Sequence, residues 1–543
     1  MNINVLVVIP ARGGSKGIPR KNLRSLDGKP LIHYAIKNAI NSKYAPDVYV
    51  SSEDGEILSI AGKLGAKTLR RGNHDSEDLT TLDPVIYNAL QDISHIENKK
   101  YDIVVTLQPT SPLLKTNSID NAIMMLIENP KLDTVISAVD DTHLSWSKND
   151  DSYMPNYKER LNRQLLPKNF KETGGFLITR ARNVFINNRI GRKVTLAVVS
   201  DEESIDIDTF ADWGLCEFYV KRKRIVFVVS GHNDIGLGHV YNTLLLANDF
   251  VEHEVFFLVD HKSQMAFDKI ELKNYKVFKQ SSDDISEDII DLNPDIVIND
   301  KLDTQKSYIK KLKDNGIRVI NFEDLGPGTK IADLTINAIY PEKEVVPNHY
   351  FGHKYFILRD EFILAERALI RPEVKTILLS FGGVDPNNYT QKVLLAIYEI
   401  CRIKNITIKI VTGFGYSKFK SLESYPEVEI YHSVENISDY MLQADLIFTS
   451  AGRTVYEVAS LGVPAVVLAQ NERELTHFFA NSEHGFINLG LGTLVENDRI
   501  VQVFHCLLES FEKRQYMAKL MANCNLSLGR SRVVSLIREV INS

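Results

Sequence analysis

The chain has 543 residues, too many for one hydrophobic core, so we expect three compact units. Its 44% hydrophobic and 25% charged residues are typical of soluble globular proteins. The net charge of −6 argues against general nucleic-acid binding. No apolar run approaches the roughly 18 residues that a membrane span needs. The four cysteines are scattered without C-x-x-C spacing, which favours a cytoplasmic protein with reduced thiols and predicts no zinc site.

The first predicted strand, Val5–Ile9, runs into a strongly basic loop that is broken by glycines. Glycine accepts backbone dihedrals that other residues avoid, so this loop can bend close to a bulky ligand. Backbone N–H groups beside lysine and arginine form a cradle for phosphate oxygens. The spacing matches neither the Walker A loop nor G-x-G-x-x-G. An ordinary strand and turn with a solvated basic face is the alternative. The basic residues are Arg12, Lys16, Arg20, Lys21 and Arg24.

Strands and helices alternate through the rest of the first third, which predicts a mostly parallel sheet in a three-layer α/β domain. Leu31–Ala39 has helical spacing. The polar stretch 108–112 follows a buried strand, and open α/β sheets bind ligands at the carboxyl ends of their strands. The further predicted strands are Val48–Ser51, Tyr101–Leu107, Thr134–Val139, Phe176–Thr179 and Val194–Val198.

Two carboxylates follow these strands at Asp206 and Asp208. Residues at i and i+2 project to the same side where the backbone is extended. Such a pair suits a hard cation with oxygen ligands, and magnesium bound to a triphosphate is the usual case. Asp-x-Asp pairs are more often solvated loop acids, but a basic triphosphate loop in the same domain would need a metal partner.

Four motifs of this region resemble the CMP-sialic acid synthetase family of cytidylyltransferases over about residues 1–215. They are IPARGGSKGIPRKN at 9–22, LQPTSPL at 107–113, TGGF at 173–176 and the acid pair. The resemblance implies a nucleotidyltransferase-type Rossmann-like domain that makes CMP-nonulosonate from CTP and a nine-carbon keto-sugar acid. It also implies Mg²⁺ and a homodimer formed through this domain. One departure is SSED at 51–54, where relatives more often have S-T-D.

The resemblance also implies roles for individual residues. Charge builds on the departing pyrophosphate, so Lys21 and the metal-bearing Asp208 would be the main catalytic groups. The family's carboxylate-binding arginine corresponds to Arg163, in an Arg–Gln pair with Gln164. By the same correspondence, the triphosphate would be contacted by Arg12, Ser15, Lys16 and Lys21, and the nucleoside by Asn22. The sugar and nucleotide would be contacted by Gln108, Thr110 and Ser111, and the magnesium ion would be bound by Asp206 and Asp208.

The second half begins at a strand, Ile225–Val229, without a Pro/Gly/Ser-rich linker before it. We therefore expect close tethering of the halves. A glycine-containing loop leads to His239 and a predicted helix, Val240–Ala247. At the first helical turn the helix dipole favours a neutral imidazole that can act as a base, and Gly238 allows close approach. A capping or packing histidine is the alternative.

Strand–helix alternation continues and then restarts near residue 370, which predicts two Rossmann-like lobes. Acids follow predicted strands at Asp300, Glu323 and Asp324, where most such acids are solvated or cap helices. In the second lobe, Ser450 is the predicted N-cap of a helix that ends at Leu461. The remaining strands predicted are Val255–Val259, Asp295–Ile298, Arg318–Phe322, Thr376–Phe381 and Asp445–Phe448, with a helix at Tyr389–Cys401.

Short blocks over about residues 225–540 are similar to the hydrolase of pseudaminic acid synthesis, which releases UDP from a UDP-2,4-diacetamido-trideoxyhexose. The blocks are IGLGHV at 235–240, FGHKYFILRDEF at 351–362, SFGG at 380–383, residues 444–445, 450–457 and 471–472. The similarity implies a GT-B fold without a metal. His239 would activate water, and Gly383, Thr454 and Glu457 would hold UDP.

Two departures from that hydrolase keep other functions open. Relatives usually have R-x-D-x-S-x-x-I-G before the G-x-G-H, where this chain has SGHND at 230–234. Relatives also usually have an arginine two or so residues after the histidine, where this chain has Tyr241 and Asn242. The second half is therefore predicted to be a UDP-sugar hydrolase, with a UDP-sugar glycosyltransferase or a non-hydrolysing binding module as alternatives. We expect domains at 1–221, 224–366 and 372–543, the last binding UDP.

Overall fold

The computed structural model describes residues 3–14, 17–72, 81–150, 152–232, 236–341, 346–413, 415–419, 422, 424–425 and 427–543. The chain divides into two compact units, Met1–Arg222 and Lys223–Ser543. No helix in these ranges is both long and apolar enough to cross a membrane.

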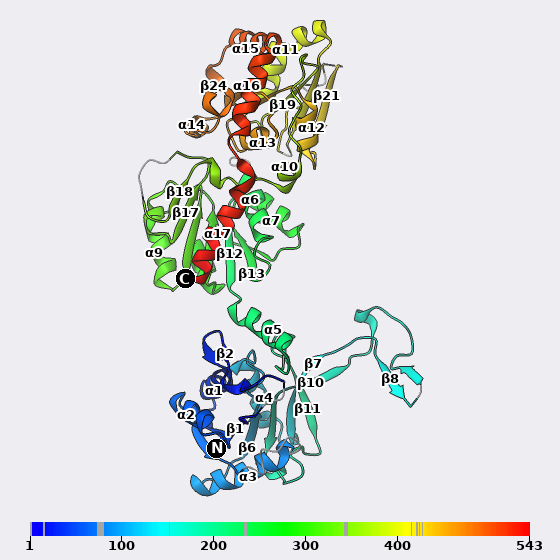
Figure 1. The fold of residues 1–543 in the computed structure, drawn as a ribbon, viewed down its shortest axis with the longest axis vertical. Coiled ribbons are helices and arrows are strands. Elements are labelled where there is room, and N and C mark those ends of the chain that lie inside the picture. Colours follow the sequence, from blue (N-terminus) through cyan, green and yellow to red (C-terminus); the bar gives the residue numbers. More distant parts are fainter. Residues whose placement is uncertain are drawn as a thin grey trace. The chain divides into compact units, whose positions relative to one another are not determined.

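The first unit is built on a seven-stranded sheet in the order β11-β7-β10-β6-β1-β4-β5 (Figure 1). Only the pairs that β10 forms with β6 and β7 are antiparallel, so the predicted mostly parallel sheet is confirmed. The strands are β1 (Val5–Pro10), β4 (Asp47–Ser52), β5 (Lys67–Arg70), β6 (Ile103–Leu107), β7 (Thr134–Asp140), β10 (Phe170–Arg180) and β11 (Val194–Val198). A small hairpin joins β2 (Ser25–Leu26) to β3 (Lys29–Pro30).

Helices cover both faces of this sheet because side chains of a strand alternate between its faces. Val7 and Ile9 pack with α1, α2 and α4 on one face, whereas Leu6 and Val8 pack with α3 on the other. Trp213 of α5 packs in a separate cluster beside the basic loop. The helices are α1 (Ile32–Ile40), α2 (Gly55–Lys63), α3 (Leu82–Ile96), α4 (Thr116–Glu128) and α5 (Phe210–Lys221).

An arm leaves the sheet between β7 and β10. It carries the hairpin of β8 (Trp146–Asn149) and β9 (Ser152–Pro155), which projects from the sheet in Figure 1. The short 3-10 helix η3 (Arg163–Leu165) lies on the same excursion, and none of its residues is buried.

The second unit contains two sheets in which every strand pair is parallel. The first sheet has the order β14-β13-β12-β15-β16-β17-β18, and the second has the order β21-β20-β19-β22-β23-β24. These are the two Rossmann-like lobes of a GT-B fold, as predicted. The first lobe's strands are β12 (Arg224–Val229), β13 (Glu254–Val259), β14 (Val277–Lys279), β15 (Ile296–Asp300), β16 (Arg318–Phe322), β17 (Leu334–Asn337) and β18 (His349–Phe351). The second lobe's strands are β19 (Thr376–Ser380), β20 (Thr407–Thr412), β21 (Val428–His432), β22 (Leu446–Thr449), β23 (Ala465–Ala469) and β24 (Phe486–Leu491).

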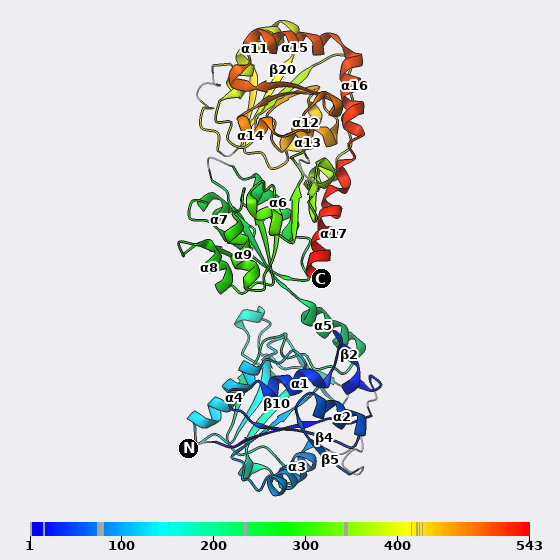
Figure 2. The same cartoon turned by 90° about the vertical axis from the view of Figure 1, so that its left-hand side faces the viewer.

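The last helix, α17, returns from the second lobe to pack on the first (Figure 2). Val533 and Ile537 join the cluster of Val240, and Arg530 binds Asp249 at 2.7 Å. The two lobes are therefore held together by an element that both share. The helices of this unit are α6 (Gly238–Ala247), α7 (Gln264–Glu271), α8 (Ile285–Asp291), α9 (Lys306–Asp314), α10 (Asp360–Leu364), α11 (Tyr389–Lys404), α12 (Ile437–Gln443), α13 (Thr454–Leu461), α14 (Glu472–Leu475), α15 (Asn497–Glu509), α16 (Phe511–Ala522) and α17 (Gly529–Asn542).

The predicted N-cap at Ser450 is wrong. Helix α13 begins only at Thr454, and Arg453 takes the N-cap position with helical backbone angles and no capping side-chain bond. Residues 450–453 instead form the turn that connects β22 to the helix. The predicted helix end at Leu461 is confirmed, because Gly462 follows it with a φ of 76° and ends the helix in the left-handed conformation.

Candidate functional site

In the first unit, the basic loop that follows β1 meets the acid pair that precedes α5. Lys21 Nζ donates a hydrogen bond to the carbonyl oxygen of Ile207 and lies 3.2 Å from Asp208 Oδ1. Gly17 approaches the same segment so closely that a Cβ atom there would lie 2.3 Å from the carbonyl oxygen of Asp208. A larger residue would push the loop away, so this glycine lets the cationic loop and the carboxylates share one site.

The third element of this site is the T-G-G-F turn within β10. A Cβ atom on Gly174 would lie 3.3 Å from Asp206 Oδ2 and 3.5 Å from Gln108 Nε2. Gly174 has a φ of +73°, which side-chain-bearing residues rarely adopt. Glycine here therefore brings Gln108 and Asp206 together.

Several polar atoms of these predicted site residues are buried without a hydrogen-bond partner among the described residues. Buried polar atoms are nearly always hydrogen-bonded in native structures, so such a cluster indicates the place of a polar ligand. The atoms are Asn22 Oδ1, Ser111 Oγ and Asp206 Oδ1.

The acid pair fits a divalent cation. Burial raises the pKa of Asp206; the Thr110 hydroxyl opposes this rise, and the neighbouring Asp208 carboxylate adds to it. A cation between the two carboxylates would relieve both effects and would use the unpartnered Oδ1 of Asp206. The described residues hold no cluster of three or more His, Cys, Asp or Glu side chains suited to a metal. Two protein carboxylates with the remaining ligands from phosphates and water would suit magnesium.

The remaining predicted residues of this site fall into two groups. The backbone oxygen of Arg12 accepts a hydrogen bond from Asn22 Nδ2 at 2.9 Å, while Ser15 and Lys16 lie outside the described residues. Arg163 and Gln164 lie in η3, exposed on the arm, and neither contacts the acid pair within the ranges described. The fold therefore assembles the nucleotide side of the predicted site but not the predicted pair for the sugar carboxylate.

In the second unit, His239 stands at the second residue of α6, in the first turn as predicted. Its Nδ1 lies 2.5 Å from Asp300 Oδ1 at the end of β15. An ionised carboxylate only accepts hydrogen bonds, so Nδ1 carries the proton and Nε2 is left as the basic nitrogen. This histidine is therefore oriented for proton transfer rather than for capping its helix.

Asn242 explains one of the departures from the relatives. Its Nδ2 donates to Asp300 Oδ2 at 2.8 Å, so the two oxygens of Asp300 hold one residue each. His239 and Asn242 stand three residues apart on one face of α6, the spacing at which helical side chains are neighbours. Asn242 thus fixes the carboxylate that in turn fixes the histidine.

The acids at the ends of these strands are buried, so the prediction that they are solvated or cap helices is wrong. Exposed fractions are 0% for Asp300, 2% for Glu323 and 1% for Asp324. Each follows a central strand and binds groups of neighbouring elements instead of water: Asp324 accepts from Thr304 and Asn321, and Glu323 accepts from the backbone of 338–339. Burial raises the pKa of Glu323 to about 7.

The second lobe faces this region with the turns after β19, β20 and β22. A Cβ atom on Gly413 would lie 2.4 Å from the Cα of Gly383, whereas one on Gly383 would meet open space. Gly383 thus packs its backbone on one side and leaves room for a ligand on the other. Thr454 is the first residue of α13, where free N–H groups favour anions.

Glu457, the residue predicted to bind a ribose, forms an ion pair at the junction of the lobes. Its Oε1 lies 3.0 Å from Arg359 Nε and 2.9 Å from Nη2. Burial raises the pKa of Glu457, and Arg359 opposes that effect. A ribose bound by Glu457 would have to share this carboxylate with Arg359.

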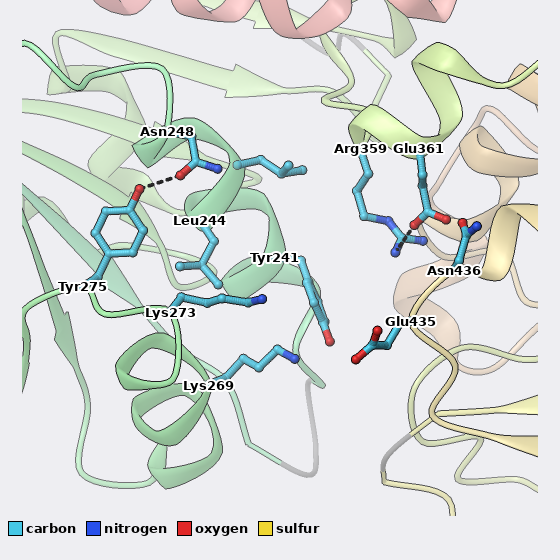
Figure 3. Close-up of a pocket in the computed structure, with 11 residues that line it drawn as sticks. Tyr241, Leu244, Asn248, Lys269, Lys273, Tyr275, Arg359, Glu361, Glu435 and Asn436 are labelled. Carbon is cyan, nitrogen blue, oxygen red and sulfur yellow. Dashed lines mark hydrogen bonds and ion pairs between the residues drawn. The ribbon is translucent and has the colours of Figure 1, made fainter.

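A cavity of about 610 Å³ lies beside the same ion pair (Figure 3). Helix α6 supplies Tyr241 and Leu244 to one wall, with Asn248 just after the helix, and Arg359, Glu361, Glu435 and Asn436 line the other. The wall residues of α6 lie on a different helix face from His239 and Asn242. The cavity is therefore separate from the His239 site.

A family model described as cytidylyltransferase matches residues 6–174. The CMP-N,N'-diacetyllegionaminic acid synthase of Legionella pneumophila is 34% identical over 227 residues, which are 40% of this chain and 95% of that protein. The chain belongs to the cytidylyltransferase family. A pseudaminic acid cytidylyltransferase of Campylobacter jejuni is 44% identical over 125 residues, 23% of this chain and about half, 53%, of that protein.

One relative extends beyond the cytidylyltransferase unit. It is the Helicobacter pylori "Pseudaminic acid cytidylyltransferase and UDP-2,4-diacetamido-2,4,6-trideoxy-beta-L-altropyranose hydrolase", 25% identical over 495 residues. These cover 86% of this chain and 88% of that protein, so both units align with one chain.

Two residues of the sites cannot be predicted from their local sequence. In the cytidylyltransferase unit, Glu53 Oε1 accepts the N–H of Gly13 at 2.6 Å, and its Oε2 lies 3.1 Å from Arg71 Nη2. It anchors the basic loop from the residue after β4, at the position where the S-S-E-D motif departs from relatives. Asp300 lies 61 residues after His239 and is one of several acids at strand ends, so only the sheet order brings the two together.

Proposed function

We propose that the cytidylyltransferase unit transfers the cytidylyl group of CTP to a nonulosonic acid of the sialic, legionaminic or pseudaminic type. The 2-hydroxyl oxygen of the sugar attacks the α-phosphorus, the α–β phosphoanhydride bond breaks, and pyrophosphate leaves with the bonding electrons. The observation that carries this proposal is the cluster of unpartnered buried polar atoms around Lys21 and the acid pair.

In this reaction Lys21 stabilises negative charge on the phosphates as it develops. Asp206 and Asp208 would hold Mg²⁺, which supplies further positive charge to the triphosphate when bound. Gln108, Thr110 and Ser111 follow β6 on the side of the acid pair and would position the nucleotide and the sugar. Glu53 holds the loop backbone through the N–H of Gly13.

The test is a panel of sialic, legionaminic and pseudaminic acids incubated with the full chain, CTP and Mg²⁺, with pyrophosphate release as the readout. We expect release to require one of the three acids. Release from CTP alone at the same rate, or no release with any of them, would contradict the proposal. The panel also shows which of the three acids is the substrate, a choice on which the names of the relatives differ.

For the second unit we propose hydrolysis of a UDP-linked amino sugar of the 2,4-diacetamido-trideoxyhexose type. His239 Nε2 takes a proton from a water molecule whose oxygen attacks the anomeric carbon, and UDP leaves with the electrons of the broken C–O bond. The His239–Asp300–Asn242 chain of hydrogen bonds carries this proposal, because it orients the imidazole and places the proton of the neutral ring on Nδ1.

A glycosyltransferase and a binding module without turnover are the alternatives for this unit. UDP release from the purified chain without any acceptor supports the hydrolase. Release that requires an acceptor supports a transferase, and saturable binding without release supports a binding module. His239→Ala should stop release but leave CTP-dependent pyrophosphate formation intact.

A further inference from the structure

A second ionic feature crosses between the lobes at the His239 site. Glu323, at the end of β16, is 3% exposed at its side chain, and Arg453 stands before α13 in the other lobe. Arg453 Nη2 lies 3.8 Å from Glu323 Oε1, which is too long for a hydrogen bond. That nitrogen is buried and bonds to no described residue. A buried guanidinium nitrogen with this spare donor capacity indicates a site for an anionic group.

The two partners are held differently. The backbone N–H groups of Ala338 and Ile339 donate to the two oxygens of Glu323 at 3.2 and 3.4 Å. The carboxylate is therefore anchored in its own lobe. The guanidinium has a long ion pair and lies over the ring of Phe356 at 5.7 Å, so its donors can turn to another partner.

Arg453 also reaches the reacting centre of the proposed hydrolase. A Cβ atom on Gly238 would lie 3.3 Å from Arg453 Cδ, so the arginine borders the residue before His239. In the hydrolysis, water activated at His239 attacks a carbon whose leaving group is a nucleoside diphosphate. A cation beside that carbon would face the phosphates.

We propose that Arg453 binds the diphosphate of the nucleotide sugar and that Glu323 holds Arg453 while no ligand is bound. Binding draws the guanidinium out of the ion pair, forms charge-assisted hydrogen bonds to the diphosphate and leaves Glu323 to take up a proton. This inference rests on the proposed nucleotide-sugar function of the second unit.

Proton uptake follows from the groups that face Glu323. These are Arg453 from the second lobe, Asp300 from β15, and the phenol groups of Tyr340 and Tyr456. Burial raises the pKa of Glu323 to about 7, and Arg453 restrains that rise. When Arg453 turns to the ligand, the pKa rises further. Because the bound state then holds more protons, UDP affinity should fall as the pH increases above 7.

The experiment is calorimetric titration of UDP into the full chain at pH 7.5, in buffers of different ionisation enthalpy. The slope of heat against ionisation enthalpy gives the protons taken up. We expect the unaltered chain to take up about half a proton more per UDP than Glu323→Gln, which keeps the shape of the side chain and one of its two backbone hydrogen bonds. The difference cancels protons that UDP itself or the first unit contributes. Arg453→Gln should weaken UDP binding roughly 10- to 100-fold.

Two controls make the test specific. Arg473 and Asp303 form another ion pair between the lobes at 3.3 Å, with Asp303 exposed and Arg473 partly exposed, and Asp303→Asn should retain the full proton uptake. Uridine lacks the diphosphate and should give no uptake that depends on Glu323. Equal uptake by the unaltered chain and Glu323→Gln, or equal uptake with uridine, would overturn this inference alone. Failure of UDP to bind the unaltered chain would overturn the proposed hydrolase as well.

Discussion

The two sites of this chain use one architectural device for different chemistry. Each lies at the carboxyl ends of parallel strands beside a turn that contains glycine, the usual place for ligands in α/β sheets. In the first unit a lysine faces two carboxylates, and Asp208 is 76% exposed at its side chain. In the second, a histidine is held by an aspartate that is fully buried. The first site has one exposed carboxylate that can accept a metal and phosphates, whereas the buried carboxylate of the second site can only orient a base. The fold supplies the position, and the side chains at the strand ends supply the reaction.

The largest expected effect separates the two sites directly. His239→Ala should reduce UDP release on the order of 10³-fold, because a positioned general base typically contributes 10²–10⁴ in rate. Pyrophosphate formation from CTP should be unchanged. His505→Ala, on α15, serves as the matched control and should affect neither activity. Normal UDP release by His239→Ala would show that this histidine is not the base.

Removing the acid at the other site should have the next largest effect. Asp208→Ala should lower CTP-dependent pyrophosphate release roughly 10²–10³-fold, since one charge-stabilising contact is typically of this size. Raising the Mg²⁺ concentration should recover part of the rate. Asp201→Ala removes an exposed acid of the same segment and should leave both activities intact. If Asp208→Ala retains full activity at low Mg²⁺, the metal proposal is wrong.

Asp300→Asn tests whether the buried carboxylate of the second site orients the imidazole of His239. The amide can donate to His239 Nδ1, which would move the imidazole proton to Nε2 and remove the base. We expect UDP release to fall about 10²-fold, within the range for loss of an orienting partner. The control is Asp295→Asn, near the opposite end of β15, where Asp295 accepts the N–H of Arg224. An equal loss in both variants would mean that stability, not orientation, is affected.

The sequence predicts the first site better than the second because its chemistry is local. One loop carries most of the residues predicted to bind phosphate, and glycines and cations have direct physical meaning there. Asp206 and Asp208 also lie only two positions apart in the chain. The parallel sheets follow equally well, since buried apolar strands alternate with helices.

Residues that act through the sheet order are not predictable in the same way. Asp300, Glu323 and Asp324 occupy equivalent positions after strands, and the sequence does not reveal which of them faces His239. Local pattern also favoured Ser450 as a helix cap, although the chain needs a longer turn before α13. Burial of these acids depends on contacts between lobes and strands that no local window contains.

A smaller effect tests how the glycine-containing loop of the first site is held in place, which has no counterpart among the variants of the second site. Glu53→Gln weakens the acceptor for the N–H of Gly13 and removes the charge that pairs with Arg71. Burial tends to raise the pKa of Glu53, but these hydrogen bonds and Arg71 keep it below its usual value, so the carboxylate is the stabilised form. We expect KM for CTP to rise about tenfold, the size of one lost charged hydrogen bond, with a smaller change in kcat. UDP release should not change; if KM for CTP is also unaltered, Glu53 does not position the loop.

The smallest effect compares the two ends of the first sheet. At the amino end of β4, Asp47 accepts hydrogen bonds from Lys99 at 2.7 Å, Lys67 at 2.9 Å and Tyr101 at 3.0 Å. Burial tends to raise the pKa of Asp47, but these three donors lower it to about 2. A carboxyl group with a lowered pKa in the folded state stabilises that state above its unfolded pKa of about 3.9 and loses this contribution as the pH falls towards 2.

Asp47→Asn should therefore lower the free energy of unfolding by about 1 kcal/mol at pH 7, after allowance for solvent screening, and by less at pH 3. Urea denaturation at both pH values measures the difference. CTP-dependent activity at pH 7 should stay normal, because this ionic cluster stabilises the fold and is separate from the proposed ligand site at Lys21 and Asp208. A difference that grows as the pH falls would contradict this assignment.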